Sequence, residues 1–306
     1  MPSAHAAISP APARGARPTS VMLMTALAQV STFARLDFEG GCGDANTPMG
    51  LLDRFRLTGR VAIVTGAGRG IGQGIALAVA EMGGHVVCAA RTEREIEETA
   101  ERARRFGARA LPVHCDVTDP AQLDEVVRRT IAEFGRIDVL VNNAGGFPPM
   151  KFLDTDLPSW EWCLRFNLNS AFILTRACLP HMLERDGGVV LNISSAAGRI
   201  VRSGFVAYGT AKAALSFMTR QLAAELAPRV RVNALAVGAV ATSALLPFLD
   251  EPTRRQMETM TPMRRLGTVE DVALAALWLC SPAGEFVTGK VVEVDGGIES
   301  TNWPFD

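Results

Sequence analysis

Tyr208 and Lys212 are the residues whose types and spacing best suit proton transfer. Tyr208 is the only tyrosine among 306 residues, and Lys212 follows four positions later in a segment of small and apolar residues. A helix over 207–227 would place the phenol and the ammonium on one face. A nearby cation lowers the pKa of tyrosine from about 10 by favouring phenolate. The pair predicts a general acid/base, although an amphipathic helix with a packed Tyr and a solvated Lys gives the same spacing.

The composition favours small-molecule partners. Hydrophobic residues make up 48% of the sequence, and the formal net charge is −1. We therefore expect no nucleic-acid partner, and no apolar run reaches the length of about 18 residues that a membrane span needs. The six cysteines are widely spread, which predicts reduced thiols in a cytoplasmic protein. The four histidines are not clustered, so we expect no protein-bound metal.

The first 48 residues differ in composition from the rest of the chain. They are rich in Ala, Pro and Ser and contain no acidic residue before Asp37. This composition predicts a disordered or non-native N-terminal extension (1–48) ahead of one catalytic domain (49–306). Arg14 and Arg17 precede the apolar run 21–28, which also suits a signal or transit peptide, but the run is short and no sharp cleavage site follows it.

From Val61 onward, short β-rich runs alternate with helical patterns. The predicted strands cover 61–65, 85–90, 110–116, 139–142, 188–194, 231–236 and 291–294. The predicted helices cover 71–82, 92–106, 119–134, 158–186, 207–227 and 269–280. The strands are apolar on both faces, which is typical of a parallel sheet covered by helices. The sequence predicts a single-domain α/β fold, a Rossmann-like doubly wound parallel sheet of about seven strands with helices on both faces.

A glycine-rich turn follows the first predicted strand. Gly66, Gly70 and Gly72 lie between that strand and an apolar helix. Glycines there allow close backbone approach, and the helix N-terminus presents free N–H groups to a pyrophosphate. The turn predicts a dinucleotide site.

Two arginines favour NADP(H) over NAD(H). The second strand is followed by Arg91, at the place where an acidic residue would bind the ribose of NAD. An arginine there can pair with a 2′-phosphate, and Arg69 in the glycine turn can add a second contact. Glu93, Glu95 and Glu97 could instead pair with both arginines on the surface.

Further motifs follow in order along the chain. They are Asp116, the run Asn142-Asn143-Ala144-Gly145, Asn167, Ser195, and Tyr208 with Lys212. With the glycine turn, this order resembles the short-chain dehydrogenase/reductase family over about residues 52–300. The resemblance implies an NAD(P)-dependent oxidoreductase that interconverts a secondary alcohol and a ketone.

The resemblance implies four catalytic residues. Tyr208 exchanges a proton with the substrate oxygen, and Lys212 lowers the tyrosine pKa and binds the nicotinamide ribose. Ser195, 13 residues before Tyr208, bonds the substrate oxygen in preference to Ser194. Asn167 kinks its helix and holds a water in a proton relay to Lys212.

The resemblance also implies the cofactor contacts. Besides Tyr208 and Lys212, they are Gly66, Arg69, Gly70, Ile71, Gly72, Arg91, Asp116, Val117, Asn143, Ala144, Gly145, Val240 and Thr242. Of these, Asp116 and Val117 face the adenine, and Val240 and Thr242 face the carboxamide. The chain has Val237 where the family usually has proline, so we expect a less constrained turn beside the nicotinamide.

An apolar segment over 241–262 suggests a substrate lid. Its apolar residues, with one just beyond, are Leu245, Leu246, Phe248, Leu249, Met257, Met260 and Met263. No cluster of basic residues accompanies them, which favours a hydrophobic substrate. Bacterial hydroxysteroid dehydrogenases and 3-oxoacyl-carrier-protein reductases both resemble this region, so a hydroxysteroid-like substrate and a 3-oxoacyl thioester remain open.

Other functions on this fold are weighed against the enzyme. A catalytically inactive NADP-binding sensor or scaffold would usually lack the tyrosine or the lysine. An epimerase or dehydratase tends to carry a longer C-terminal substrate domain, and enoyl reductases space their tyrosine and lysine more widely. Many family members are homotetramers, so we expect a homotetramer or homodimer.

Overall fold

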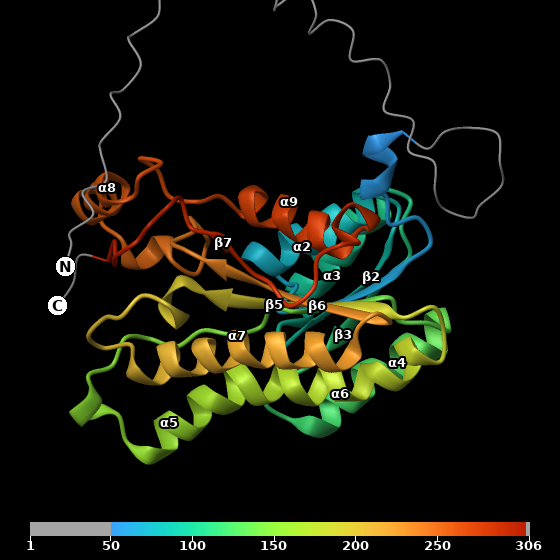
Figure 1. Cartoon of the computed structure of the whole chain (residues 1–306), viewed down its shortest axis with the longest axis horizontal. Coiled ribbons are helices and arrows are strands. Elements are labelled where there is room, and N and C mark those ends of the chain that lie inside the picture. Colours follow the sequence, from blue (N-terminus) through green and yellow to red (C-terminus); the bar gives the residue numbers. More distant parts are fainter. Residues whose placement is uncertain (1–49, 304–306) are drawn as a thin grey trace, which may run out of the picture. The chain divides into compact units, whose positions relative to one another are not determined.

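The computed structural model describes residues 50–303, except the side chain of Phe248. The predicted extension over 1–48 lies outside the described residues. Seven parallel strands form one sheet in the order β3-β2-β1-β4-β5-β6-β7 (Figure 1). Their bounds are β1 (Val61–Thr65), β2 (His85–Ala90), β3 (Ala110–His114), β4 (Val139–Asn142), β5 (Gly188–Ser195), β6 (Val230–Val237) and β7 (Val291–Val294).

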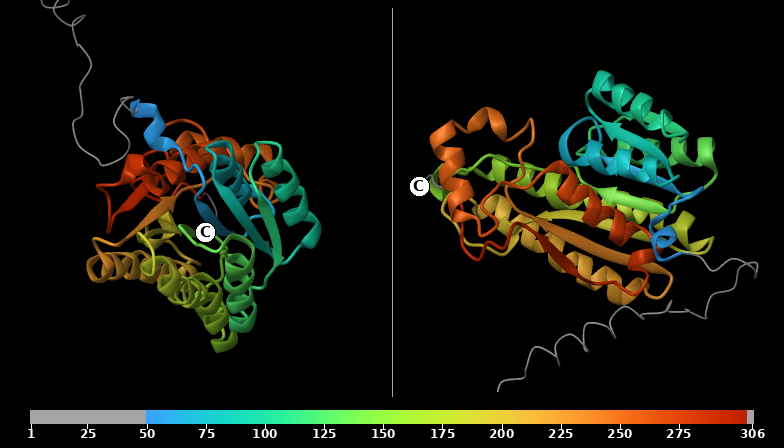
Figure 2. Two further views of the ribbon diagram at one scale, coloured as in Figure 1. Left: turned by 90° about the vertical axis from the view of Figure 1, so that its right-hand side faces the viewer. Right: turned by 90° about the horizontal axis from the view of Figure 1, so that it is seen from above.

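Helices cover both faces of the sheet. They are α2 (Gly70–Glu81), α3 (Glu93–Arg104), α4 (Pro120–Phe134), α5 (Leu157–Leu164), α6 (Ser170–Leu183), α7 (Val206–Leu226), α8 (Glu251–Met260) and α9 (Val269–Cys280). Helices α2, α3 and α9 lie on one face, and α4, α6 and α7 lie on the other (Figures 1 and 2). The predicted doubly wound fold is confirmed.

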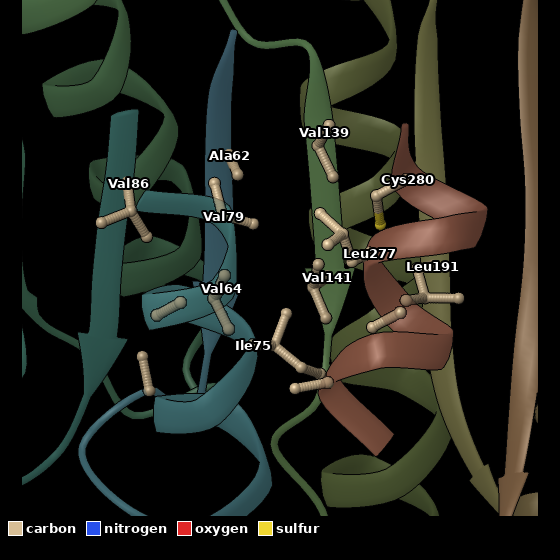
Figure 3. Close-up of a cluster of buried hydrophobic side chains, with 14 of the residues drawn as sticks. Ala62, Val64, Ile75, Val79, Val86, Val139, Val141, Leu191, Leu277 and Cys280 are labelled. Carbon is tan, nitrogen blue, oxygen red and sulfur yellow. The ribbon is translucent and has the colours of Figure 1, made fainter. Parts of the chain in front are cut away.

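The strands are apolar on both sides because each face packs against helices. All five residues of β1 are buried, and alternate residues face opposite helix layers. On one face, Ile75 of α2 and Leu277 of α9 lie against the side chains of β1, β4 and β5 (Figure 3). On the other face, Leu140 of β4 packs with Leu174 of α6. Burial on both faces stabilises the sheet whose carboxyl ends carry the polar motifs.

The strand order creates a crevice at one edge of the sheet. The chain adds β2 and β3 on one side of β1 and then places β4 on the other side. At such a reversal, the loops after the neighbouring strands diverge and leave room for a ligand at the carboxyl ends. The glycine turn follows β1 and the Asn-Asn-Ala-Gly run spans the end of β4, so both border this crevice.

The predicted helix over 158–186 is two helices joined by a π-helical turn. This turn, η4 (Arg165–Asn169), separates α5 from α6 and contains Asn167. Its wider hydrogen-bonding pattern inserts an extra residue, and such turns are frequent at functional sites. Apolar periodicity alone does not reveal the insertion.

Helix α8 lies inside the segment interpreted as a lid. The Asp250 side chain caps its N-terminus by accepting from the Thr253 N–H at 2.9 Å. Two i,i+4 ion pairs, Arg254–Glu258 and Arg255–Glu251, run along its surface. These polar start and pairing signals predict a helix. The lid interpretation considered only the apolar residues of this segment and therefore did not predict helix α8.

Val237 belongs to β6, so the less constrained turn expected beside the nicotinamide can begin only after it and stays a prediction. Val237 is the last residue of β6 and is paired in register with Ser195 of β5 and Val294 of β7. The following Gly238 N–H donates to the Val294 carbonyl at 3.0 Å. Valine has the N–H that proline lacks and a β-branched side chain, so it extends the strand.

A chain of buried polar side chains ties the sheet to α6 and α7. The Asn142 amide donates to Thr175 Oγ1 at 3.1 Å and to Asn192 Oδ1 at 2.9 Å. The Asn192 amide in turn donates to Thr219 Oγ1 at 2.9 Å. A fully satisfied buried network gives one preferred arrangement, and this one fixes α7, the helix that carries Tyr208, against β5.

Replacing Asn192 tests this network. We expect Asn192→Leu to lower the free energy of unfolding in urea by about 2–4 kcal/mol, because the buried Asn142 and Thr219 lose their partner. Asn169→Ala is the matched control, since Asn169 is exposed, and its effect should stay within about 0.5 kcal/mol. Equal effects of the two substitutions would contradict a structural role for the network.

Candidate active site

Tyr208 and Lys212 meet at the carboxyl end of β5. Helix α7 begins at Val206, so Tyr208 lies in its first turn and Lys212 one turn later. The Lys212 ammonium is 5.7 Å from the centroid of the Tyr208 ring. It is 3% exposed and donates to the Ile193 carbonyl of β5 at 2.9 Å. The helix brings the predicted pair together and points the cation at the end of the sheet.

Burial controls the electrostatics of this pair. It lowers the pKa of Lys212 to about 8. It also raises the pKa of Tyr208, against the lowering effect of a hydrogen bond with Ser195. The sequence led us to expect that Lys212 lowers the tyrosine pKa. In the chain alone, desolvation of the phenol dominates and the net pKa is raised, so the lowering effect of Lys212 stays a prediction.

The structure separates the two candidate serines. Ser195 ends β5, accepts from the Ala197 N–H at 3.2 Å and lines the same cavities as Tyr208. The Ser194 hydroxyl donates to the Lys212 carbonyl at 3.0 Å and lies 2.7 Å from the Ser216 hydroxyl. Neighbouring strand residues face opposite ways, so Ser195 is the one beside Tyr208. Ser194 instead anchors α7.

Asn167 anchors the loop after β4. Its Oδ1 accepts from the Gly146 N–H at 2.8 Å, and its Nδ2 donates to the Gly146 carbonyl at 3.1 Å and the Cys163 carbonyl at 3.0 Å. A Cβ on Gly145 would lie 2.8 Å from Asn167 Oδ1 and 2.9 Å from Lys212 Nζ. Glycine at 145 is thus required for Lys212 to reach its position. The expected water-holding role of Asn167 stays a prediction.

A cavity of about 430 Å³ runs along the carboxyl ends of the strands. Fourteen of the fifteen predicted cofactor residues line it, namely Gly66, Arg69, Gly70, Ile71, Gly72, Arg91, Asp116, Val117, Asn143, Ala144, Gly145, Tyr208, Lys212 and Thr242. Val240 does not, because it forms a bridge with Gly267 and is buried beside the second cavity described below. Sequence reasoning missed other lining residues, including Thr92, Glu95 and Phe166.

The glycine turn fits a dinucleotide. Gly66 and Gly70 have positive φ angles of 64° and 56°, which side chains disfavour. A Cβ on Gly72 would lie 2.3 Å from the Gly66 carbonyl oxygen, so α2 packs this close only with glycine. Asn143 supports the turn by donating to the Thr65 carbonyl at 2.8 Å. No side chain caps the N-terminus of α2, and this terminus borders the cavity. Its free N–H groups can therefore bind a pyrophosphate.

Charges of both signs line the adenosine end of this cavity. Arg69 lies 3.9 Å from Glu95, and its side chain is 62% exposed. Burial raises the pKa of Asp116, but hydrogen bonds from Thr118 and the charge of Arg91 outweigh it, so the pKa lies below its usual range. Arg91 and Arg69 thus face the cavity while Glu95 partly neutralises Arg69.

A second cavity of about 370 Å³ shares Ser195 and Tyr208 with the first. Its walls are largely apolar and include Phe147, Pro149, Ile200, Phe205, Leu245, Ile298 and Trp303. Of the apolar residues predicted for a lid, Leu245 alone among those described lines this cavity, and the lid itself stays a prediction. Met257 is the fully buried residue of α8, and Met260 and Met263 are exposed. Leu246 and Leu249 are absent from the walls, and the Phe248 side chain lies outside the described residues.

Most of the walls that were not predicted come from two segments far apart in the sequence. They are the connection from β5 to α7 and the C-terminal residues 298–303, and the loop after β4 adds Phe147 and Pro149. Arg202 also lines the cavity, so the cavity wall contains a basic group that the sequence analysis did not predict. The aromatic residues near the chain end were a usable signal, but nothing in the sequence joins two segments about a hundred residues apart.

Residues 50–303 contain no membrane-spanning helix, no cluster of metal ligands and no disulfide. No helix there is long and apolar enough to cross a bilayer. No group of three or more His, Cys, Asp or Glu in that range could hold a metal ion. The five cysteines in it are buried and form no disulfide.

Known proteins are similar to this chain in sequence and fold. The family model described as enoyl-(acyl carrier protein) reductase matches residues 66–299. An uncharacterized oxidoreductase of Mycobacterium tuberculosis is 47% identical over 82% of this chain and 97% of that protein. The 7alpha-hydroxysteroid dehydrogenase of Escherichia coli is 37% identical over 80% of this chain and 96% of its own.

A solved structure of 7 alpha-hydroxysteroid dehydrogenase, complexed with NADH and 7-oxo glycochenodeoxycholic acid, has a TM-score of 0.78 at 36% identity. The match covers 80% of this chain and 96% of that one. The chain belongs to the short-chain dehydrogenase/reductase family. It is an NAD(P)-dependent oxidoreductase that interconverts secondary alcohols and ketones.

The pH dependence of stability tests the burial of Lys212. Between its folded pKa of about 8 and its ordinary value of 10.5, the unfolded chain binds this proton and the folded chain releases it. This contribution to the free energy of unfolding therefore rises with pH. We expect the free energy of unfolding of the wild type minus that of Lys212→Met, measured in urea, to rise from about pH 8 to about pH 10. A constant or falling difference would show that burial does not destabilise the ammonium.

Proposed function

We propose that the chain interconverts a hydrophobic ketone and its alcohol, with Tyr208 as the group that carries the proton. One observation supports this above the others. Ser195 and Tyr208 border both the cofactor cavity and the apolar cavity. A carbonyl bound in the apolar cavity would therefore meet these two hydroxyls at the junction.

The residues at the junction divide the work. The Ser195 hydroxyl hydrogen-bonds the substrate oxygen, and the Tyr208 hydroxyl donates a proton to it during reduction or accepts one during oxidation. A nicotinamide, when bound, supplies the hydride or accepts it. Lys212 holds a positive charge beside the phenol and favours phenolate when the proton leaves. Gly145 leaves space for the Lys212 ammonium, and Asn167 holds the loop at the neighbouring Gly146.

Tyr208→Phe tests the assignment of the proton carrier. We expect ketone reduction to fall by at least about 10³-fold, because proton transfer is lost, while the Kd of the nicotinamide cofactor changes little. Turnover is followed by nicotinamide absorbance and binding by calorimetry. Phe205→Tyr in the Tyr208→Phe background is the control for a hydroxyl in the wrong place, and it should not restore activity. Near wild-type turnover in Tyr208→Phe would overturn the mechanism.

The cofactor proposed is NADP(H), preferred over NAD(H). Arg91 follows β2, is exposed and lines the cavity near Asp116. Arg69 supplies a second cation from the glycine turn. A 2′-phosphate is recognised by such arginines through charge-assisted hydrogen bonds. The opposing charge is Glu95, which lies 3.9 Å from Arg69, so Arg91 carries most of the expected preference.

Arg91→Ala tests this preference. We expect the Kd for NADPH to rise about 10- to 100-fold and the Kd for NADH to stay nearly constant, since only the phosphate loses a partner. The matched control is Arg94→Ala on α3, whose side chain is 82% exposed and pairs with Glu98. Equal changes in both affinities would refute the role of Arg91.

The substrate proposed is hydroxysteroid-like. The second cavity offers an apolar space of about 370 Å³ that suits a fused-ring ketone. The relative solved with 7-oxo glycochenodeoxycholic acid supports this choice. A 3-oxoacyl thioester is the alternative class, and a screen of both classes decides between them.

The assembly proposed is a homodimer or homotetramer. Large apolar side chains are exposed on α5, α6 and α7, and they include Leu157, Trp162, Phe172 and Phe217. Exposed apolar surface of this kind is typical of a protein interface. A second copy of the chain is the partner we infer for it.

The compartment and domain boundary are also proposals. Five buried free thiols suit a reducing compartment, and we assign the chain to the cytoplasm.

We place the catalytic domain at 49–306 and treat 1–48 as an extension outside it, since relatives are matched over 96–97% of their length by about 80% of this chain.

A further inference from the structure

The C-terminal segment forms part of the wall of the apolar cavity. Ile298, Thr301, Asn302 and Trp303 all line the cavity that also contains Tyr208. The segment follows β7, the edge strand of the sheet, and crosses to the connection between β5 and α7. Its residues are therefore in a position to touch a substrate whose carbonyl lies at Tyr208.

Two arginines of the β5–α7 connection fix this segment. Arg199 donates to the Ile298 carbonyl at 2.8 Å and forms ion pairs with Asp295 at 3.2 Å and Glu299 at 3.0 Å. Arg202 donates to Thr301 Oγ1 at 3.1 Å and to the Trp303 carbonyl at 2.5 Å. The two arginines thus bind both backbone carbonyls and side chains of the C-terminal segment, which fixes the position of this part of the wall.

A third anchor lies on the other side of the segment. The buried Asn302 amide donates to Thr261 Oγ1 at 2.9 Å. Thr261 ends α8 and is itself buried. The segment is thus held between the β5–α7 connection and the end of α8.

A row of aromatic rings leads from the reacting hydroxyl to the chain end. The Tyr208 and Phe205 ring centroids are 6.2 Å apart, and those of Phe205 and Trp303 are 6.4 Å apart. The Arg202 guanidinium lies 5.6 Å from the Phe205 ring centroid and 5.7 Å from that of Trp303. Cation–π contacts of this kind hold the two rings relative to each other.

Trp303 and Arg202 stand at a boundary between two hollows. Together with Pro149 they line the substrate cavity and also an outer hollow of about 310 Å³. The outer hollow is lined by polar and charged residues that include Lys151 and Asp154. The pair therefore closes the apolar cavity at the end remote from Tyr208.

We propose that Trp303 is a specificity-determining residue that contacts the end of the substrate remote from the carbonyl, and that Arg202 is its positioning residue. The inference rests on the proposed function, because it takes Tyr208 as the reacting end. A small ketone at Tyr208 does not extend past Phe205. A fused-ring ketone does, and the flat face of Trp303 gives its far end an apolar surface.

Trp303 variants test the contact with two ketones of different size. Cyclohexanone is the short probe and an oxosteroid is the long one, each measured as kcat and KM at saturating cofactor. In Trp303→Ala we expect kcat/KM for the oxosteroid to fall about tenfold or more, mainly through KM, because a large apolar contact is lost. The value for cyclohexanone should change less than about twofold, and Trp303→Phe should retain most of the activity on the oxosteroid.

A matched control and a positioning variant complete the experiment. Phe286→Ala removes a fully exposed aromatic side chain outside the cavity and should change neither ketone. Arg202→Met should raise KM for the oxosteroid as Trp303→Ala does, while Arg202→Lys, which keeps a cation near the rings, should recover part of the loss. Both Arg202 variants should leave the Kd of the cofactor unchanged.

The outcomes separate the inference from the proposed function. Equal losses for the two ketones in Trp303→Ala, or no loss for either, would overturn the inference and leave the proposed function standing. A wild-type protein that reduced cyclohexanone but not the oxosteroid would also overturn the inference. A wild-type protein that bound the cofactor yet reduced neither ketone would contradict the proposed function itself.

Discussion

The burial of the Lys212 ammonium is the constraint on which the site depends. A charged amine 3% exposed to solvent needs fixed partners, and the Ile193 carbonyl at 2.9 Å is one of them. Space for the amine exists only because residue 145 is glycine. The hydroxyl of Ser194 bonds the Lys212 carbonyl, and so ties this turn of α7 to β5. These separate features of the sequence all hold one cation beside one phenol.

The parallel sheet explains why this cation lies where two cavities meet. Reversal of the strand order beside β1 opens the cofactor crevice, and β5 ends at Ser195 on the border of that crevice. The chain then passes through the β5–α7 connection, which forms part of the apolar cavity, before α7 returns Tyr208 to the border. Loops after parallel strands can vary without disturbing the core, so substrate contacts gather there. The sheet and α7 thus position the reacting residues, and the loops after the strands provide the contacts that select the substrate.

Sequence reasoning predicted the elements with strong local signals. The strands, the glycine turn and the Tyr208–Lys212 helix were evident because their patterns are periodic or demand particular residue types. The interruption of the helix at Asn167 was expected only from the family resemblance, and the polar helix α8 was missed, because neither changes the apolar periodicity. Trp303 was missed for another reason, since its contact with Phe205 joins distant segments. The upward shift of the Tyr208 pKa in the chain alone was not predicted, because desolvation of the phenol depends on packing that no local pattern shows.

The central claim is that Tyr208 is a half-buried phenol whose ionisation is controlled by its surroundings. It is the only tyrosine in the chain, so the ultraviolet absorbance of phenolate reports this residue alone. Titration of the protein without cofactor should give a pKa above the ordinary value of about 10, because burial dominates. Titration with the oxidised cofactor bound should give a lower pKa, because the added positive charge favours phenolate. An ordinary pKa that does not respond to the cofactor would contradict the account.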